Sequence, residues 1–357
     1  MKILLLILLP IVSFGQFVKS GSNFIMPQIF INQKVVGFDC DLWLPDTIYL
    51  TEGNSIQIYN DNLAYIPDNK KNRLTFDWVC SIGTETTTYY NIKASTTGDY
   101  SIKVYATNSI GNIIDSASSV ITIEPKIALG NKTILAIGNS LTAGGWVYDR
   151  PQIDDSLNVT LTSVGTKGSN PNMHEGISGW TYAKFMGVLS PFYIGGKIDF
   201  DAYCTALPSY PDVIRVQLGI NDCLFSILNG TITMATLEGT VNKMIDSLLN
   251  QTTANIILCL PTTGANTHYG AIAQLGDDVK YEPYILTMRQ FHKAIYTTYG
   301  NKNYNSRVYM GFEELFIDRN LGYPKVSGLH SDLVHPVSTG HRQFIRGTLN
   351  MINHIYQ

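Results

Sequence analysis

Five short apolar runs, separated by longer stretches with helical spacing, constrain the fold of residues 130–357 more than any other feature. Strand alternating with helix predicts an α/β domain, a doubly wound parallel sheet with helices on both faces, because parallel neighbours need a crossover segment between them. The runs lie at 133–137, 159–164, 213–218, 255–260 and 307–310.

Between these runs, apolar residues recur every three or four positions, which is the spacing of a helix that covers a sheet with one face. The clearest such helix contains residues 237–249. A second helix is predicted at 285–299, where Gly300 would end it, and a third from about residue 339 to the C-terminus. The stripe of the first helix consists of Leu237, Val241, Met244, Ile245, Leu248 and Leu249, and the inner side of the third of Phe344, Ile345, Leu349 and Ile352.

Residues 17–125 follow a different pattern, in which apolar and polar residues alternate over short runs broken by turn residues. A period of two predicts strands with one buried face, so this region is expected to be all-β. A Trp in mid-domain and the Gly98-Asp99-Tyr100 corner resemble those of immunoglobulin-like or PKD-like domains. The resemblance implies an N-terminal β-sandwich domain at 17–125, joined by a linker to the α/β domain at 130–357. The alternating runs are 55–59, 74–78, 100–104 and 119–123.

The first fifteen residues have the three parts of a secretory signal: Lys2, an apolar run at 3–12, and the small residues Ser13 and Gly15 at the cleavage positions. A membrane anchor is the competing interpretation, but the run is about half of the ~20 residues needed to span a bilayer. No cysteine directly follows the run to carry a lipid. We therefore expect a secreted or periplasmic protein that begins at Gln16 and has no membrane span.

The charge of the chain argues against a nucleic-acid partner. The sequence has 25 Lys and Arg against 28 Asp and Glu, a net charge of -3, and no basic run. Five cysteines is an odd number, so at least one thiol stays unpaired within a chain. Cys40 and Cys80 could bridge, whereas Cys259 lies in an apolar strand-like run and is expected to be a buried thiol. No pair has the spacing of metal ligands.

Polar residues gather after four of the predicted strands. Because ligands bind at the carboxyl ends of parallel strands, these clusters are expected to converge at one edge of the sheet. Each cluster by itself is also explained as a turn or a helix cap, so only their order and their placement after strands favour a catalytic site. The clusters are Gly138-Asn139-Ser140-Leu141-Thr142, the loop at 174–181, Gly219-Ile220-Asn221-Asp222 and Asp332-Leu333-Val334-His335-Pro336.

In this order the four clusters resemble the blocks of the SGNH, or GDSL-like, hydrolases over residues 132–357. The resemblance implies that Ser140 is the nucleophile, His335 the base and Asp332 the carboxylate that orients it. It also implies that the backbone N–H groups of Ser140 and Gly179 and the side-chain amide of Asn221 bind the oxyanion. The loop His174-Glu175-Gly176-Ile177-Ser178-Gly179-Trp180-Thr181 is most similar to the acetylxylan-esterase branch of the family.

These residue types also suit ester hydrolysis for reasons independent of any family. A serine hydroxyl attacks only when a base takes its proton, and a neutral imidazole does so near neutral pH. A carboxylate on the second ring nitrogen fixes the tautomer, and preorganised N–H groups stabilise the charge that gathers on the carbonyl oxygen. Asn139 stands where the family usually has an aspartate. That aspartate supports the site and is not the attacking group, so its replacement leaves the reacting groups in place. No metal or organic cofactor is needed.

Aromatic residues flank the predicted nucleophile and oxyanion loop. Trp146 and Trp180 are candidates for stacking on a sugar ring of the substrate, and the alternative is that they pack the loops. We expect the acyl group of the substrate to be small. Together with the predicted export and the sugar-stacking aromatic residues, this predicts an exported serine esterase that removes acetyl groups from a polysaccharide or oligosaccharide. The β domain would then be a spacer or an accessory module.

Two other functions stay open at this stage. A lipid-directed esterase or lysophospholipase would use the same residues but is expected to have an apolar acyl channel, whereas the loops at the predicted site are polar. A non-catalytic carbohydrate-binding surface protein could keep the fold without turnover. That function would be favoured by loss of Ser140, Asp332 or His335, and all three are present.

Overall fold

The computed structural model describes residues 40–64, 74–157, 160–300 and 304–357. The predicted secretory signal and the start of the β domain lie outside these residues. The segment Asp39–Gln357 forms one compact unit. Within the described ranges, no helix has both the length and the apolar content needed to cross a bilayer.

The first described region is all-β and consists of two sheets. Its strands alternate as predicted: Ile56 and Ile58 are fully buried, and Ser55 is exposed. Trp78 of one sheet stacks on Tyr90 of the other with ring centroids 5.2 Å apart, so the sheets share a core. The first sheet has the order β1 (Thr47–Thr51), β7 (Ile113–Glu124), β6 (Gly98–Asn108), β3 (Leu74–Cys80), and the second the order β2 (Ser55–Tyr59), β5 (Tyr89–Lys93), β4 (Thr84–Glu85).

All five cysteines of the sequence are free in the described structure. The possible bridge between Cys40 and Cys80 is therefore wrong. Cys259 is buried as expected. Burial raises the pKa of Cys40 to about 12, an effect that the nearby carboxylates of Asp115 and Asp41 increase, so this thiol carries little thiolate at neutral pH.

The second region contains a parallel sheet with the strand order β10-β8-β13-β14-β15, and β9 also pairs with β8. Every pair in this sheet is parallel. The strand order reverses at β8, because the chain first adds β9 and β10 on one side and then crosses to β13 on the other. This confirms the predicted doubly wound sheet. The strands are β8 (Asn131–Gly138), β9 (Thr160–Val164), β10 (Glu175–Gly176), β13 (Val213–Gln217), β14 (Asn255–Cys259) and β15 (Val308–Gly311).

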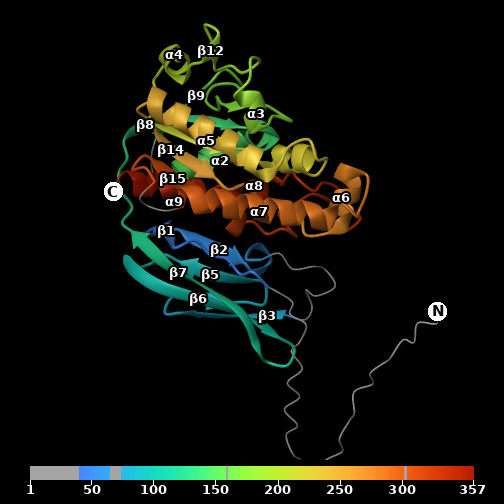
Figure 1. Cartoon of the computed structure of the whole chain (residues 1–357). Helices are drawn as coiled ribbons and strands as arrows, with labels where there is room; N and C mark the ends of the chain where they lie inside the picture. The colour runs from blue at the N-terminus through green and yellow to red at the C-terminus, as the bar shows by residue number, and fades with distance from the viewer. Residues whose placement is uncertain (1–39, 65–73, 158–159, 301–303) are drawn as a thin grey trace, which may run out of the picture. The chain divides into compact units, whose positions relative to one another are not determined.

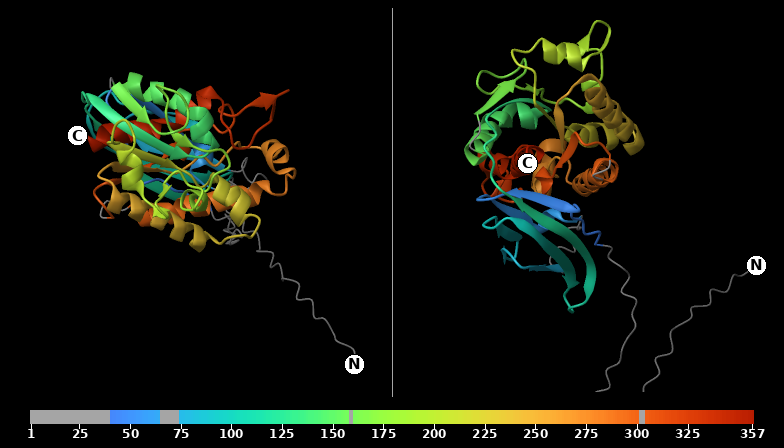
Figure 2. Two further views of the ribbon diagram at one scale, coloured as in Figure 1. Left: turned by 90° about the horizontal axis from the view of Figure 1, so that it is seen from above. Right: turned by 90° about the vertical axis from the view of Figure 1, so that its left-hand side faces the viewer.

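Helices cover both faces of this sheet (Figures 1 and 2). α5 and α7 lie side by side, while α2, α8 and α9 pack against one another and α9 contacts β14 and β15. The predicted stripe of α5 is buried except for the half-buried Leu249. The helices are α2 (Ser140–Leu157), α3 (Tyr182–Phe185), α4 (Phe200–Thr205), α5 (Met234–Gln251), α6 (His268–Leu275), α7 (Tyr281–Tyr299), α8 (Ser338–Phe344) and α9 (Arg346–Ile355).

Two helix ends differ from the expectation in detail. α7 stops at Tyr299 as predicted, but Gly300 has a right-handed φ of -69°, so it is not a left-handed cap. A Cβ at Gly300 would lie 2.4 Å from the ring of Tyr296, so close packing is what requires the glycine. The predicted last helix is divided at Ile345 into α8 and α9, with its inner residues buried as expected.

Short elements complete the described chain. The turn η1 belongs to the β region, and the others lie in the loops of the α/β region. They are the 3-10 turns η1 (Asn60–Asn62) and η3 (Glu313–Leu315), the π-helical turn η2 (Asp222–Ile227), and the hairpins β11 (Tyr193–Ile194) with β12 (Lys197–Ile198) and β16 (Lys325–Val326) with β17 (Leu329–His330).

Candidate active site

Ser140 is the first residue of α2 and is separated from the end of β8 only by Asn139. Asn139, 1% exposed, accepts the N–H of Leu141 on its side-chain oxygen at 2.9 Å, and its backbone carbonyl accepts the N–H of Ala143 at 2.9 Å. The residue that departs from the family pattern therefore caps the nucleophile helix. An asparagine oxygen accepts this bond as well as an aspartate oxygen does.

His335 lies between Ser140 and Asp332. Its Nε2 is 2.9 Å from Ser140 Oγ, across 195 residues of sequence, and its Nδ1 is 2.9 Å from Asp332 Oδ2. These are hydrogen-bond distances in the order hydroxyl, imidazole, carboxylate, the geometry in which an imidazole can take a proton from a hydroxyl. The structure thus brings together the three residues that the sequence predicts as nucleophile, base and orienting group.

Backbone donors hold Asp332 in place. Its Oδ1 accepts the N–H groups of Val334 at 2.7 Å and His335 at 2.8 Å. Burial by itself raises the pKa of Asp332, but the bonds from the His335 ring and from the two N–H groups outweigh it, so the pKa lies below its ordinary value. The carboxyl is therefore ionised at neutral pH. The His335 side chain is 41% exposed, so solvent and substrate can reach the ring.

The loop at 174–181, which the sequence predicts to bind the oxyanion, is bonded to the end of β8. β10 pairs with the end of β8, and the N–H of Ile177 donates to the carbonyl of Gly138 at 2.9 Å. A Cβ on Gly176 would lie 2.5 Å from the backbone N of Ala143, so only glycine allows the loop to touch the first turn of α2. Gly179 follows with a φ of +72°, a conformation that also favours glycine.

Asn221, only 4% exposed, lies just after β13, on the other side of the point where strand order reverses. Its Nδ2 donates to the carbonyl of Trp180 at 2.9 Å. This bond fixes the plane of the amide and uses one of the two N–H groups that an amide nitrogen carries. The side chain therefore connects the oxyanion loop to the neighbouring strand.

Asp222 is a supporting residue that sequence reasoning missed. It is 1% exposed, and its Oδ1 accepts the N–H of Tyr182 at 3.1 Å, next to the oxyanion loop. Burial raises the pKa of Asp222 to about 7, because the bonds from backbone N–H groups only partly offset the cost of burying the charge. Its position directly after Asn221, at the end of a strand, is the signal that could have found it.

The two predicted substrate-binding tryptophans have different environments. Trp146 is fully buried in the core under the sheet, and its Nε1 donates to Ser163 Oγ at 3.3 Å. The prediction that Trp146 contacts substrate is therefore wrong, because the inner face of α2 carries this residue into the core. Trp180 is half-buried and packs edge-on against Phe185 with ring centroids 4.9 Å apart. It stays a candidate.

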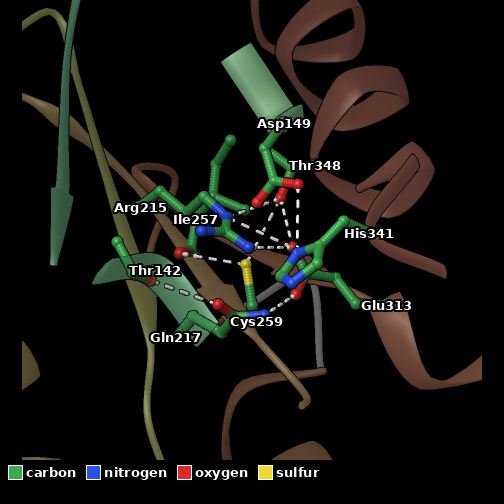
Figure 3. Close-up of polar contacts among 9 residues, drawn as sticks. All are labelled: Thr142, Asp149, Arg215, Gln217, Ile257, Cys259, Glu313, His341 and Thr348. Carbon is green, nitrogen blue, oxygen red and sulfur yellow. Dashed lines mark hydrogen bonds and ion pairs between the residues drawn. The ribbon is translucent and has the colours of Figure 1, made fainter. Parts of the chain in front are cut away.

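A buried polar network contacts the first turn of α2 (Figure 3). Arg215 and Glu313, both fully buried, form an ion pair at 2.7 Å. Gln217 donates to Glu313 at 2.6 Å and accepts from Thr142 Oγ1 at 3.2 Å, and Thr348 adds a donor to Glu313 at 2.7 Å. These bonds offset part of the cost of burying the charges. The network ties the first turn of α2 to β13 and η3.

No protein-family model matches the chain, and none of the curated proteins matches it in sequence. Solved structures similar to it include a protein from Parabacteroides merdae described as a GDSL-like lipase (17% identity, TM-score 0.40) and the acetyl xylan esterase AlAXEase (16% identity, TM-score 0.32). The first likeness covers 64% of this chain and 97% of the other, and the second 62% and 99%.

A further likeness concerns fibronectin(III)-like modules of Clostridium thermocellum CbhA, with 20% identity, a TM-score of 0.18 and coverage of 24% of this chain and 94% of the other. At these identities and TM-scores the likenesses assign no activity to the present chain. Its function is therefore argued from the geometry of its own site.

Proposed function

We propose that the protein is a serine esterase in which Ser140, His335 and Asp332 act together. The observation that carries the proposal is the pair of 2.9 Å contacts that join the three side chains in a row. An imidazole held in this way accepts the serine proton as the hydroxyl attacks. The ionised carboxylate on the far side keeps the ring in the right tautomer and stabilises the imidazolium.

The proposed reaction has two halves. In the first, Ser140 Oγ bonds to the ester carbonyl carbon while its proton passes to His335 Nε2, and the intermediate then expels the alcohol, which takes that proton. In the second, water attacks the acyl-serine, gives a proton to His335, and releases the acid with the regenerated serine. The chain's own residues supply every proton transfer.

The negative carbonyl oxygen needs donors that are already in position. We assign this role to the backbone N–H groups of Ser140 and Gly179 and to the second N–H of Asn221. Three facts support the assignment. Ser140 begins a helix, and the first N–H groups of a helix lack partners within it. The loop before Gly179 is bonded to β8, and the amide of Asn221 is fixed by its bond to the carbonyl of Trp180. No Cβ contact within 4 Å would occur at Gly179 among the described residues, which leaves room for a substrate.

For the substrate we propose an acetyl ester of a carbohydrate. The loop from His174 to Thr181 is similar to the acetylxylan-esterase branch of the hydrolases it resembles. Trp180, half-buried and bonded through its carbonyl to Asn221, offers an indole beside the oxyanion donors. Aromatic faces of this kind stack on sugar rings. Export to the periplasm or the outside of the cell belongs to the same proposal.

Apolar side chains near the site favour a second candidate, a lipid-directed esterase. Tyr269 and Ile272 of α6 are 50% and 47% exposed, and Leu329 of the adjoining hairpin is 46% exposed. α6 contacts β17, and a Cβ on Gly270 would lie 3.1 Å from the Cα of Leu333, beside Asp332. An exposed apolar rim beside the turn that carries Asp332 and His335 suits a longer acyl chain.

The first test replaces the nucleophile. Ser140→Ala should reduce hydrolysis of an aryl acetate by more than about 1000-fold, since no other group forms the acyl-enzyme. The melting temperature should stay unchanged, because only one hydroxyl is removed. Ser118→Ala, an exposed serine of β7, is the matched control and should keep full activity. Equal rates for Ser140→Ala and the parent would rule out the proposed mechanism.

The second test separates the two substrates. Initial rates on aryl esters of two to eight carbons should fall as the acyl chain lengthens, and acetylated glycans should release acetate. One extra methylene changes selectivity by only about 1–3 kcal/mol in a hydrophobic pocket, so the whole series is needed. A preference for octanoyl over acetyl would favour the lipid-directed candidate, with the triad unaffected.

A further inference from the structure

The turn η1 of the β region forms hydrogen bonds with loops that lie beside the turn carrying Asp332 and His335. The backbone carbonyl of Asp61 accepts bonds from the guanidinium groups of Arg289 and Arg319, each at 3.2 Å. The carboxylate of Asp61 accepts from Asn266 Nδ2 at 3.1 Å. Beside it, the fully buried Asn62 donates to the carbonyl of Ile317 at 2.8 Å. This turn is therefore anchored by specific polar contacts.

Arg319 joins this turn to the loop at 264–266. It is 3% exposed, and its Nε donates to the carbonyl of Gly264 at 2.6 Å while another nitrogen bonds Asp61. The backbone N–H of Asn266 donates back to the carbonyl of Arg319 at 3.1 Å. Because a guanidinium is a planar fork of donors, it fixes the relative positions of the carbonyls that it joins.

The same loop holds the turn that carries the proposed base. The N–H of Ala265 donates to the carbonyl of Leu333 at 2.8 Å, and Leu333 is fully buried. Gly264 has a φ of +93°, and a Cβ there would lie 2.5 Å from the Leu333 carbonyl oxygen, so the two backbones are in direct contact. Leu333 stands between Asp332 and His335 in sequence. A shift of the loop would therefore move the carboxylate relative to the ring.

We propose that Asp61 is a positioning residue for the pair Asp332 and His335, and that the β region is part of the active-site scaffold. The side-chain route runs from the Asp61 carboxylate through Asn266 to the loop at 264–266, and from there to Leu333, while Arg319 bonds the backbone carbonyl of Asp61 to the same loop. This inference rests on the proposed function for its kinetic consequence, since a misplacement of about 1 Å already costs up to about 100-fold in rate. Its structural consequence, a displacement of the turn that carries Asp332 and His335, can be measured without any substrate.

The test compares two substitutions of Asp61. Asp61→Ala removes the acceptor of Asn266, whereas Asp61→Asn keeps an oxygen that can accept the same bond. Asp61→Ala should lower kcat on an aryl acetate by about three- to tenfold with KM within about twofold, and Asp61→Asn should restore it. The acid limb of the pH–rate profile should move to lower pH in Asp61→Ala, because a looser carboxylate stabilises the imidazolium less.

Asp41→Ala is the matched control. Asp41 pairs with Lys293 of α7 at 2.9 Å, and both side chains are more than two-thirds exposed. This pair also joins the β region to the α/β region, but it contacts α7 and not the loop at 264–266. Asp41→Ala should therefore keep the parental kcat and pH profile. A loss equal to that of Asp61→Ala would mean that general docking of the β region matters, and would overturn the specific route.

An NMR measurement at a single pH keeps the inference separate from the proposed function. The His335 ring signal, assigned by its loss in His335→Gln, should differ in chemical shift between Asp61→Ala and the parent and agree between Asp61→Asn and the parent. An unchanged signal in Asp61→Ala would overturn the inference, whatever the activity. If the parent hydrolyses no ester while the signal moves as expected, the proposed function fails and the positioning role stands.

Discussion

Two histidine–aspartate pairs contact α2, and they differ in access and in partners. In the first, His335 is 41% exposed, lies 2.9 Å from Asp332, and has Ser140 on its other nitrogen. In the second, His341 of α8 is 6% exposed and its Nδ1 lies 3.4 Å from Asp149 of α2. The same two residue types are thus present once at the surface and once in the interior.

The difference shows what makes such a pair suitable for catalysis. Asp332 is fixed by two backbone N–H groups, whereas neither oxygen of Asp149 has a hydrogen-bond partner among the described residues. His341 packs so closely on α2 that a Cβ at Gly145 would lie 2.0 Å from its ring. The inner pair holds two helices together and has no room for a substrate. The outer pair, His335 and Asp332, has a serine hydroxyl in contact with the ring, an oriented carboxylate and open access.

The largest expected effect comes from breaking each pair separately. His335→Ala should reduce ester hydrolysis by more than about 1000-fold and leave the melting temperature nearly unchanged, because the ring is partly exposed. His341→Ala should destabilise the fold by about 3 kcal/mol, since it opens a cavity and leaves Asp149 without its neighbour. Steady-state kinetics and thermal melts of both variants measure the two effects.

The comparison requires that His335→Ala loses activity and keeps stability, and that His341→Ala loses stability and keeps activity. Folded His341→Ala, assayed below its melting temperature, should keep kcat within about tenfold of the parent, because His341 packs against Asp149 and Gly145 of α2, whereas Ser140 is contacted by His335. If His335→Ala lost stability and kept activity, the roles assigned to the two pairs would have to be exchanged.

A smaller loss is expected when the outer site loses its side-chain oxyanion donor. Asn221→Ala should lower kcat by about 100- to 1000-fold, with a smaller change in KM, because the bond strengthens only as charge develops. Asn229→Ala is a suitable control, since its amide also donates to a backbone carbonyl, that of Phe225, at 3.0 Å and is exposed. Equal rates for the two variants would remove Asn221 from the oxyanion hole.

The last effect concerns stability and its dependence on pH. Asp222 has its pKa raised from 3.8 to about 7, so between these values the folded state binds more protons than the unfolded state. The contribution of Asp222 to the free energy of unfolding is therefore present in acid and is lost as the pH rises towards 7. The loss is at most about 4 kcal/mol. Asp222→Asn removes this dependence and keeps an oxygen for the Tyr182 N–H.

Urea unfolding of the parent and of Asp222→Asn at pH 5 and pH 8 measures this difference. The variant should gain stability over the parent at pH 8 relative to pH 5. A stability difference that is the same at both pH values would mean that Asp222 titrates in its ordinary range. The outer pair is expected to show the opposite sign, because the lowered pKa of Asp332 contributes stability that is lost only in strong acid.

The sequence predicted much of the α/β region because its signals are local. The five apolar runs fall on strands of the sheet, and the stripe of α5 is buried, since both patterns follow from the geometry of a single element. The placement of Ser140 and His335 after strands likewise follows from strand–helix alternation. Trp146 was misjudged because its burial depends on which face of α2 meets the sheet. Asp222 was missed because burial, not residue type, shifts its pKa.

By itself, the sequence determined the parallel doubly wound sheet, the change of pattern near residue 130 and the set of polar residues that end its strands. Tertiary structure decided that His335 reaches Ser140 across 195 residues, that one histidine–carboxylate pair is open and the other closed, and that Asp61 contacts the loops beside the site. The physical reason is that periodicity records how one element meets its neighbours on average. Contacts between distant residues depend on the packing of all the elements together.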